Sequence, residues 1–200
     1  MRPLSREQVS QALMPQKTLG LVGPDIPMVF TDTRRPVPGA LFVALVGANF
    51  DAHNHLQEAL DGGAAGLVIS KDEALPPDLP PETFVVVVDD TQQALTRIAE
   101  LVRQAHPGRF AAVTGSVGKT TVKDMLAAAL VESGGAAASP GNWNNEIGLP
   151  LSLFATGGDE PFVVLELGMS APGEIDALTR VAKPEVGVVT AAAAAHLEFF

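Results

Sequence analysis

Residues 114–121 carry the clearest chemistry in this chain, with the sequence Thr-Gly-Ser-Val-Gly-Lys-Thr-Thr. Gly115 and Gly118 allow a tight backbone turn that brings peptide N–H groups against phosphate oxygens. Lys119 can reach the β- and γ-phosphates as a positive charge, and the hydroxyl of Thr120 suits Mg²⁺. This stretch predicts a loop that binds a nucleoside triphosphate.

The segments on either side of the loop predict a strand before it and a helix after it. Residues 110–113 are a short apolar run, and residues 121–130 carry apolar side chains at helical spacing. The strict phosphate-loop pattern has glycine where Val113 stands, and the alternative is a glycine turn beside a solvated lysine. The order strand, loop, helix favours nucleotide binding over that alternative.

Two further chemical groups follow predicted strands of the same sheet. Glu166 comes after the apolar run 161–165, and His196 follows the strand predicted over 186–190. Ligands gather at the carboxyl ends of parallel strands, where the Lys119 loop also lies. A half-buried Glu166 suits Mg²⁺ on ATP phosphates, and His196 suits a metal or phosphate. A glutamate that reaches solvent and a structural histidine are the alternatives.

Residues 141–150, Gly-Asn-Trp-Asn-Asn-Glu-Ile-Gly-Leu-Pro, form a second unusual string. Its asparagines offer uncharged donors and acceptors suited to ribose, phosphate or carboxylate contacts. A turn-rich connector is the alternative, because Asn and Gly are common in turns.

The apolar pattern of residues 1–88 predicts one small α/β unit, and a helix is expected next over 91–106. Arg34 or Arg35 could bind a phosphate or carboxylate bidentately, or lie in a solvated turn. No further metal ligands cluster near His53 and His55, so a metal site is not expected there. Helices are expected over 6–13, 51–60 and 172–182, and strands over 41–45, 66–69 and 84–88.

Composition limits the class of protein. At 200 residues with 46% hydrophobic content, the chain can bury a sizeable core. The net charge of −10 argues against a general nucleic-acid or membrane-surface binder. With no cysteine there is no disulfide framework or thiol nucleophile. The N-terminus lacks the apolar core of a signal peptide and no run reaches membrane-spanning length, so we expect a cytoplasmic protein.

These strings together resemble the ATP-dependent Mur ligases, and within them the members that attach D-alanyl-D-alanine to a UDP-N-acetylmuramoyl tripeptide. The string over 141–150 is the most discriminating, because sister ligases carry a shorter and different loop there. The blocks that carry the resemblance are residues 31–34, 38–45, 50–53, 114–121, 141–150, 166–168, 172–176 and 195–198.

The resemblance implies an α/β fold with a small N-terminal α/β substrate domain over 1–88, which binds the UDP-sugar. The first part of a phosphate-loop, mostly parallel-sheet ATPase domain would follow over 89–200. Family members have a third domain for the dipeptide and a carbamylated lysine, which would both lie past Phe200. We therefore expect the 200-residue chain alone to be inactive. The chain also has alanines over 191–194 where the family has an Asn-x-Gly-like turn.

The resemblance further implies ATP-driven amide synthesis in peptidoglycan precursor formation, with Mg²⁺, by a monomer that needs neither nucleic acid nor membrane insertion. Lys119, Glu166 and His196 would be catalytic, and Thr120, Glu166 and His196 would hold the metal. The implied ATP-binding residues are Gly115, Ser116, Val117, Gly118, Lys119, Thr120, Thr121, Asn142 and Asn145. The implied substrate-binding residues are Thr31, Asp32, Thr33, Arg34, Asp51 and His53.

Other functions remain open at this point. A sister Mur ligase or a folylpolyglutamate-type ligase shares the chemistry, although the 141–150 string speaks against both. A non-catalytic nucleotide-binding module and a generic phosphate-loop NTPase are the remaining alternatives. Binding of a UDP-sugar as well as ATP would separate a muramoyl ligase from these.

Overall fold

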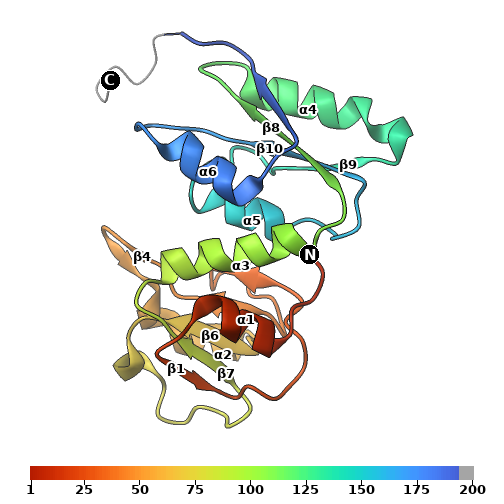
Figure 1. Ribbon diagram of the computed structural model, residues 1–200. Coiled ribbons are helices and arrows are strands. Elements are labelled where there is room, and N and C mark those ends of the chain that lie inside the picture. The colour runs from red at the N-terminus through yellow and green to blue at the C-terminus, as the bar shows by residue number, and fades with distance from the viewer. Residues whose placement is uncertain (194–200) are drawn as a thin grey trace. The chain divides into compact units, whose positions relative to one another are not determined.

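The structure is a computed structural model that describes residues 1–193 (Figure 1). The chain forms two compact units, one of Pro3–Ile98 and one of Met1–Arg2 together with the chain from Ala99 onward. We call them the N-terminal unit and the central unit, and describe each by itself. No helix in the described part of the chain is long and apolar enough to cross a membrane.

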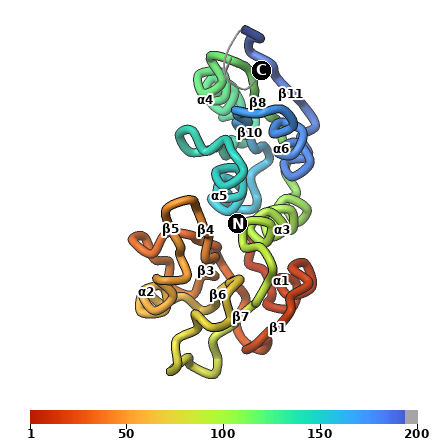
Figure 2. Tube along the Cα trace, turned by 90° about the vertical axis from the view of Figure 1, so that its left-hand side faces the viewer, coloured from red at the N-terminus to blue at the C-terminus, as the bar shows by residue number. Residues whose placement is uncertain are grey.

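The N-terminal unit is built on a five-stranded sheet of order β1-β7-β6-β3-β2, which can be followed in Figures 1 and 2. Only β1 is antiparallel to its neighbour. The strands are β1 (Lys17–Leu19), β2 (Val29–Phe30), β3 (Leu41–Val43), β6 (Gly66–Ile69) and β7 (Phe84–Val87). The other elements are α1 (Arg6–Leu13), the hairpin β4 (Val46–Gly47) and β5 (Phe50–Asp51), η1 (Ala52–His55), α2 (Leu56–Asp61) and η2 (Asp72–Ala74).

Local sequence accounts for these elements. Every residue of β6 and β7 is buried, as expected for apolar runs in the middle of a parallel sheet. A capping box between Ser5 and Gln8 starts α1. Phe42, Leu56 and Leu67 belong to one buried cluster that joins the sheet to α2.

The central unit has a four-stranded, fully parallel sheet of order β11-β8-β10-β9. In Figure 1, α4 lies on one face of this sheet and α5 and α6 lie on the other. The strands are β8 (Arg109–Thr114), β9 (Ala136–Ala138), β10 (Phe162–Glu166) and β11 (Val186–Val189). The helices are α4 (Lys119–Ala129), η3 (Val131–Ser133), α5 (Gly148–Phe154) and α6 (Glu174–Ala182), while α3 (Thr91–Ala105) runs across the boundary between the units.

The register of this sheet places chemical groups at one edge. Glu166 is paired with Val113, and Val189 is paired with Thr114. The carboxyl ends of β8, β10 and β11 therefore end at the same level, as parallel strands require. The phosphate-loop residues follow β8 directly, beside Glu166.

Most of the expected elements are confirmed, including the α/β class, and the differences have local causes. The helix expected over 51–60 begins instead as the 3-10 helix η1, because Asp51 is the last residue of β5. Neither β9, which consists of three alanines, nor α5, which follows the asparagine string, was expected. Alanine is a weak strand former, and pairing with β10 stabilises β9.

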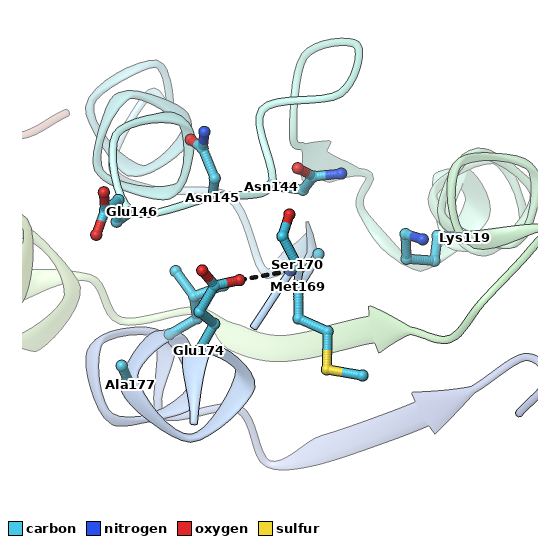
Figure 3. A pocket seen from close by; sticks show the side chains of 10 residues that line it. Lys119, Asn144, Asn145, Glu146, Met169, Ser170, Glu174 and Ala177 are labelled. Atoms are coloured by element: carbon cyan, nitrogen blue, oxygen red, sulfur yellow. Dashed lines mark hydrogen bonds between the residues drawn. The ribbon is translucent and has the colours of Figure 1, made fainter. Parts of the chain in front are cut away.

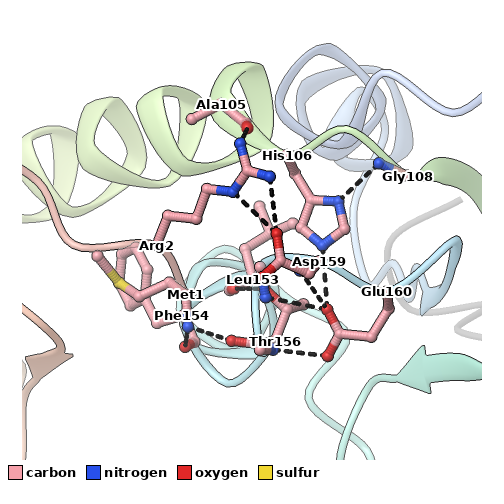
Figure 4. Close-up of polar contacts among 12 residues, drawn as sticks. Met1, Arg2, Ala105, His106, Gly108, Leu153, Phe154, Thr156, Asp159 and Glu160 are labelled. Atoms are coloured by element: carbon pink, nitrogen blue, oxygen red, sulfur yellow. Dashed lines mark hydrogen bonds and ion pairs between the residues drawn. The ribbon is translucent and has the colours of Figure 1, made fainter.

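Met1 and Arg2 pack within the central unit (Figure 4). The amino group of Met1 donates to the carbonyl of Phe154 at 3.3 Å and also to that of Thr156. The Arg2 guanidinium forms an ion pair with Asp159 at 2.7 Å. These contacts attach the start of the chain to the segment after α5.

His106 and Glu160 lie beside these contacts (Figure 4). His106 accepts the Gly108 N–H at Nδ1 and faces Glu160 through Nε2 at 3.2 Å, so the ring is neutral with its proton on Nε2. Burial lowers the pKa of His106, although Glu160 acts to raise it. Burial acts to raise the pKa of Glu160, but the N–H groups of Gly157 and its neighbours outweigh it and bring this pKa to about 2.

Candidate functional site

The phosphate loop joins β8 to α4 in a conformation that requires glycine. Gly115 has a φ of +136° and Gly118 a φ of +81°, both in the region that L side chains rarely adopt. A Cβ atom on Gly115 would also lie 2.2 Å from Oγ1 of Thr190. Lys119 is the first residue of α4, so the loop leads directly into a helix N-terminus, which favours phosphate.

The side chain of Lys119 is folded back onto the loop. Its Nζ donates to the carbonyl oxygen of Gly115 at 2.8 Å. Lys119 also lines a cavity of about 370 Å³, so its ammonium group lies at the edge of a space that a ligand can enter. Asn144, Asn145 and Glu146 line the cavity from the segment before α5 (Figure 3).

The remaining wall of this cavity comes from the segment between β10 and α6 and from α6 itself (Figure 3). The carboxylate of Glu174 accepts the N–H groups of Ser170 at 2.6 Å and Ala171 at 3.2 Å, which fixes the turn that leads into α6. The lining residues from this wall are Gly168, Met169, Ser170, Glu174, Ala177 and Leu178.

Glu166 is a buried carboxylate, with 1% of its surface exposed. Its Oε2 accepts the hydroxyl of Thr120 at 2.8 Å, and its Oε1 accepts the side-chain amide of Asn144 at 2.7 Å. No cationic side chain of the described residues forms an ion pair with it, so only neutral donors compensate its charge. A buried carboxylate normally requires a positive partner, and the hydroxyl of Thr120 beside it is a second hard oxygen ligand. These two residues fit Mg²⁺.

Within residues 1–193 no group of three or more His, Asp or Glu side chains is arranged to hold a metal ion. The third predicted ligand, His196, lies outside the described residues. A Mg²⁺ ion at Glu166 and Thr120 would therefore depend on phosphate oxygens or water for further ligands, which is usual for this cation.

The asparagine string contributes a different residue from those predicted. Asn144, which we did not predict, contacts Glu166. Asn145 lines the cavity, and its side-chain oxygen accepts the N–H groups of Ile147 at 3.2 Å and Gly148 at 2.8 Å, which holds the turn just before α5. Asn142 is exposed and is not among the residues that line the cavity.

The described part of the alanine segment contacts the tip of the phosphate loop. Ser116 donates its N–H to the carbonyl of Ala191 at 2.9 Å, and its hydroxyl lies 2.9 Å from the carbonyl of Ala193. The hydroxyl of Thr190 donates to the carbonyl of Val117 at 2.6 Å. The segment after β11 thus holds the loop through the backbone of Ala191 and Ala193 and the hydroxyl of Thr190. Thr121, the last of the predicted loop residues, is exposed in the first turn of α4.

A second cavity, of about 420 Å³, lies in the N-terminal unit. Asp32 accepts the Arg34 side chain at 2.8 Å through each of its oxygens, and this contact is the main cause that lowers the pKa of Asp32 to about 2. The lining residues are Thr31, Asp32, Thr33, Arg34, Phe42, Phe50, His55 and Glu58. The structure thus brings Thr31–Arg34 together with residues from η1 and α2.

Asp51 and His53 were predicted for the same site, but neither lines this cavity. His53 is 4% exposed, with Nδ1 at 2.7 Å from Asp51 and Nε2 accepting the N–H of Ser70 at 2.9 Å. Asp51 also forms an ion pair with Lys71, whose hydrogen bond is the main cause that lowers the pKa of Asp51. The polar atoms of both side chains are thus engaged inside the unit.

Sequence reasoning missed the side chains that complete the N-terminal cavity. Phe50 and His55 stack with ring centroids 5.4 Å apart, and His55 Nδ1 lies 3.0 Å from Glu58. Glu58 also accepts the hydroxyl of Thr33 at 3.0 Å. The exposed aromatic Phe50 was the available signal, since exposed aromatic side chains often mark binding surfaces.

Comparison with known proteins shows what the chain as a whole is similar to. Residues 113–200 match the model of the Mur ligase middle domain. The UDP-N-acetylmuramoyl-tripeptide–D-alanyl-D-alanine ligase of Escherichia coli strain K12 is 44% identical over 182 residues, which is 90% of this chain and 39% of that protein. This chain belongs to the Mur ligase family. Relatives with the same name include that of Bacillus subtilis strain 168, at 40% identity over 85% of this chain and 36% of that protein.

Solved structures of Mur ligases share the fold. The UDP-N-acetylmuramoylalanyl-D-glutamyl-2,6-diaminopimelate–D-alanyl-D-alanyl ligase of Acinetobacter baumannii superposes with a TM-score of 0.86 at 31% identity, over 99% of this chain and 44% of that one. The MurF ligase of Thermotoga maritima, solved in complex with ADP, gives 0.74 at 32% identity, over 85% and 38%. The chain thus spans less than half the length of these relatives.

Proposed function

We propose that this chain provides the UDP-sugar-binding and ATP-binding parts of a ligase that joins D-alanyl-D-alanine to a UDP-N-acetylmuramoyl tripeptide. The observation that carries the proposal is the group of Thr120, Asn144 and Glu166 beside the phosphate loop. Support also comes from the printed activity of the relatives in Escherichia coli and Bacillus subtilis. The asparagine string favours this ligase over a sister enzyme.

In the proposed reaction the terminal carboxylate of the tripeptide attacks the γ-phosphorus of ATP, and ADP leaves. The resulting acyl phosphate is attacked by the amine of D-alanyl-D-alanine, and phosphate leaves from the tetrahedral intermediate. Neither step needs a nucleophile from the protein, which agrees with a chain that has no cysteine. The protein contributes position and electrostatic stabilisation.

Each residue of the nucleotide site has a role in this proposal. Lys119 would leave the carbonyl of Gly115 and turn to the β- and γ-phosphates, while the N–H groups of the loop bind phosphate oxygens. Glu166 and Thr120 would hold Mg²⁺, which would neutralise charge that develops on the phosphates. Asn144 would orient the Glu166 carboxylate through its 2.7 Å hydrogen bond.

The N-terminal cavity is the proposed UDP-sugar site. Arg34 is largely exposed and can exchange its bond to Asp32 for a diphosphate, which guanidinium groups bind bidentately. Thr31 and Thr33 supply hydroxyl groups, and Phe50 supplies an aromatic face. Since ATP and UDP-sugars are cytosolic metabolites, we also place the protein in the cytoplasm, and we propose that it acts as a monomer.

Calorimetric titration of the 200-residue chain with Mg-ATP and with UDP-N-acetylmuramoyl tripeptide tests this function. We expect both to bind, with Lys119→Ala weakening only Mg-ATP and Arg34→Ala weakening only the UDP-sugar. Losing one charge-assisted contact removes about 1.5–3 kcal/mol of binding, roughly tenfold to a hundredfold in affinity. Lys183→Ala, at an exposed lysine, is the matched control. A chain that binds ATP without the UDP-sugar would be a generic nucleotide-binding module.

A further inference from the structure

Lys123 is a buried lysine that the proposed reaction does not use. It lies on α4 three residues after Thr120, on the same face of the helix, and only 2% of its surface is exposed. Its Nζ donates to the carbonyl oxygens of Ser139 at 2.7 Å and Gly141 at 3.3 Å. Its only carboxylate partner among the described residues is the exposed Asp124, at 3.1 Å. Burial of an ammonium group is costly, and the hydrogen bonds to these carbonyl oxygens offset that cost.

The segment that Lys123 contacts leads to the Glu166 site. Ser139 is 2% exposed, and its hydroxyl accepts the backbone N–H of Glu166 at 3.1 Å. The other end of the segment is Asn144, whose side chain donates to Glu166 and whose carbonyl accepts the N–H of Gly168 at 2.8 Å. Residues 139–144 are therefore attached to β10 and the turn after it at both ends, and Lys123 holds their first part from α4.

One face of α4 thus reaches Glu166 by two routes. Thr120 contacts its carboxylate directly, and Lys123 holds Ser139, which accepts its backbone N–H. An apolar side chain in place of Lys123 would leave the carbonyl of Ser139 without its donor. Since an unpaired buried carbonyl is unfavourable, the segment would shift to find another partner. Asn144 would shift with it.

We propose that Lys123 is a positioning residue of the nucleotide and Mg²⁺ site, which fixes residues 139–144 so that Asn144 and Glu166 face Thr120. This inference rests on the proposed function for what the site binds. It requires no change in the protonation of Lys123 and no contact with the ligand. A lysine that only filled space in the interior would support folding without affecting the Mg²⁺-dependent part of binding.

The test compares Lys123→Met with two controls in the 200-residue chain. Lys183→Met removes an exposed lysine, and Asp124→Asn removes the exposed partner of Lys123. ATP affinity is measured by calorimetry with Mg²⁺ and with EDTA. We expect Lys123→Met to reduce the gain in affinity that Mg²⁺ gives by about tenfold, while both controls keep it. Lys123→Arg, which keeps the charge, should restore part of the gain.

Hydrogen exchange on the chain without ligand gives a second readout. We expect Lys123→Met to speed exchange at the Gly168 N–H, which donates to Asn144, relative to both controls. A variant with lower thermal stability but unchanged Mg²⁺ gain and unchanged Gly168 exchange would overturn the proposal. If the wild-type chain bound no ATP, the proposed function would fail. The exchange rate would then decide alone, and an unchanged rate would overturn the role of Lys123 as well.

Discussion

Glu166 of the central unit and Asp51 of the N-terminal unit are both carboxylates at the end of a strand, and both were predicted to serve a ligand. Asp51 is paired with Lys71 and His53, so its charge is compensated inside the unit. Glu166 is more deeply buried, yet among the described residues only a hydroxyl and an amide contact its oxygens. The difference separates a carboxylate that stabilises the fold from one that would pair with a cation in the proposed function.

The two candidate sites also differ in how they are assembled. The side chains that contact Glu166 come from the first turn of α4 and from the segment between β9 and α5, both beside the carboxyl end of the parallel sheet. The N-terminal cavity is assembled from Thr31–Arg34, Phe42, Phe50 and α2. The proposed cation site thus depends on the carboxyl ends of one parallel sheet, whereas the other cavity depends on packing between the sheet and the segments around α2.

The largest expected effect concerns Glu166. Glu166→Gln keeps the size of the side chain but removes its charge, so the Mg²⁺-dependent gain in ATP affinity should fall by about tenfold to a hundredfold. Calorimetry with Mg²⁺ and with EDTA measures this gain. Thermal stability should not fall, because the buried charge has no cationic partner within residues 1–193 to lose. A marked loss of stability with an unchanged Mg²⁺ gain would make Glu166 resemble Asp51.

The reverse pattern is expected for Asp51. Asp51→Asn weakens its contacts with Lys71 and His53, and should reduce the free energy of unfolding by about 1–3 kcal/mol. Denaturant unfolding measures this change, and titrations should show unaltered affinity for Mg-ATP. Asp61→Asn, at an exposed aspartate of α2, is the control. If stability were unchanged and UDP-sugar affinity were lost, Asp51 would be a substrate-binding residue, as the sequence predicted.

A smaller effect isolates the backbone of the phosphate loop. A Cβ on Gly118 would meet no atom within 4 Å, so Gly118→Ala adds only the strain of its φ of +81°. That strain costs about 1–2 kcal/mol, which the free variant avoids if its loop leaves this conformation. ATP binding would then have to restore it, so Mg-ATP affinity should fall accordingly while UDP-sugar affinity stays unchanged. Gly187→Ala, which also meets no atom within 4 Å and has no positive φ, is the control. Equal affinities for the two variants would mean that ATP binding does not depend on relaxing or restoring this φ.

The smallest effect is the response of the central unit to mild acid. The pKa of His106 is lowered from 6.5 in the folded chain, so the unfolded chain binds this proton more readily. The contribution of His106 to the free energy of unfolding is therefore fully present above about pH 6.5 and is lost as the pH falls below that value. The melting temperature should be lower near pH 5.5 than near pH 7.5, and His106→Gln should reduce that difference. If the melting temperature of the variant changed by the same amount between these two pH values, a group other than His106 would cause the loss of stability in acid.

Glu160 extends this response to stronger acid. The pKa of Glu160, about 2, is below its ordinary value of 4.5. Its contribution to the free energy of unfolding is therefore present above about pH 4.5 and is lost as the pH falls towards 2. Melting curves below pH 4.5 should therefore show a second decrease in stability.

The sequence predicted the parts of the structure that depend on neighbouring residues. The loop around Lys119, the strand before it and the helix after it follow from glycine spacing and apolar periodicity. The position of Glu166 followed from its place after an apolar run. From the asparagine string we predicted Asn142 and Asn145 and missed Asn144, because the fold around β10, and not the local sequence, decides which amide reaches the carboxylate.

Long-range pairing explains what was missed in the N-terminal unit. Asp51 and His53 look available in the sequence, since no lysine or arginine lies near them in the chain. Lys71 and Ser70, which engage them, come from the segment after β6. Burial of His53 is therefore a property of the folded sheet, and no local pattern in the sequence indicates it.

The attachment of Met1 and Arg2 to the central unit has a consequence for how the two units can be separated. Pro3–Ile98 lies between two stretches of the central unit. The N-terminal unit is therefore inserted into the central unit in sequence and does not simply precede it. A fragment that simply starts at Ala99 would lack the Arg2–Asp159 ion pair and the amino group that donates to Phe154. Removing Pro3–Ile98 would also cut α3, so a separated central unit would need a linker from Arg2 to a point before Thr91 to keep these contacts and the whole helix.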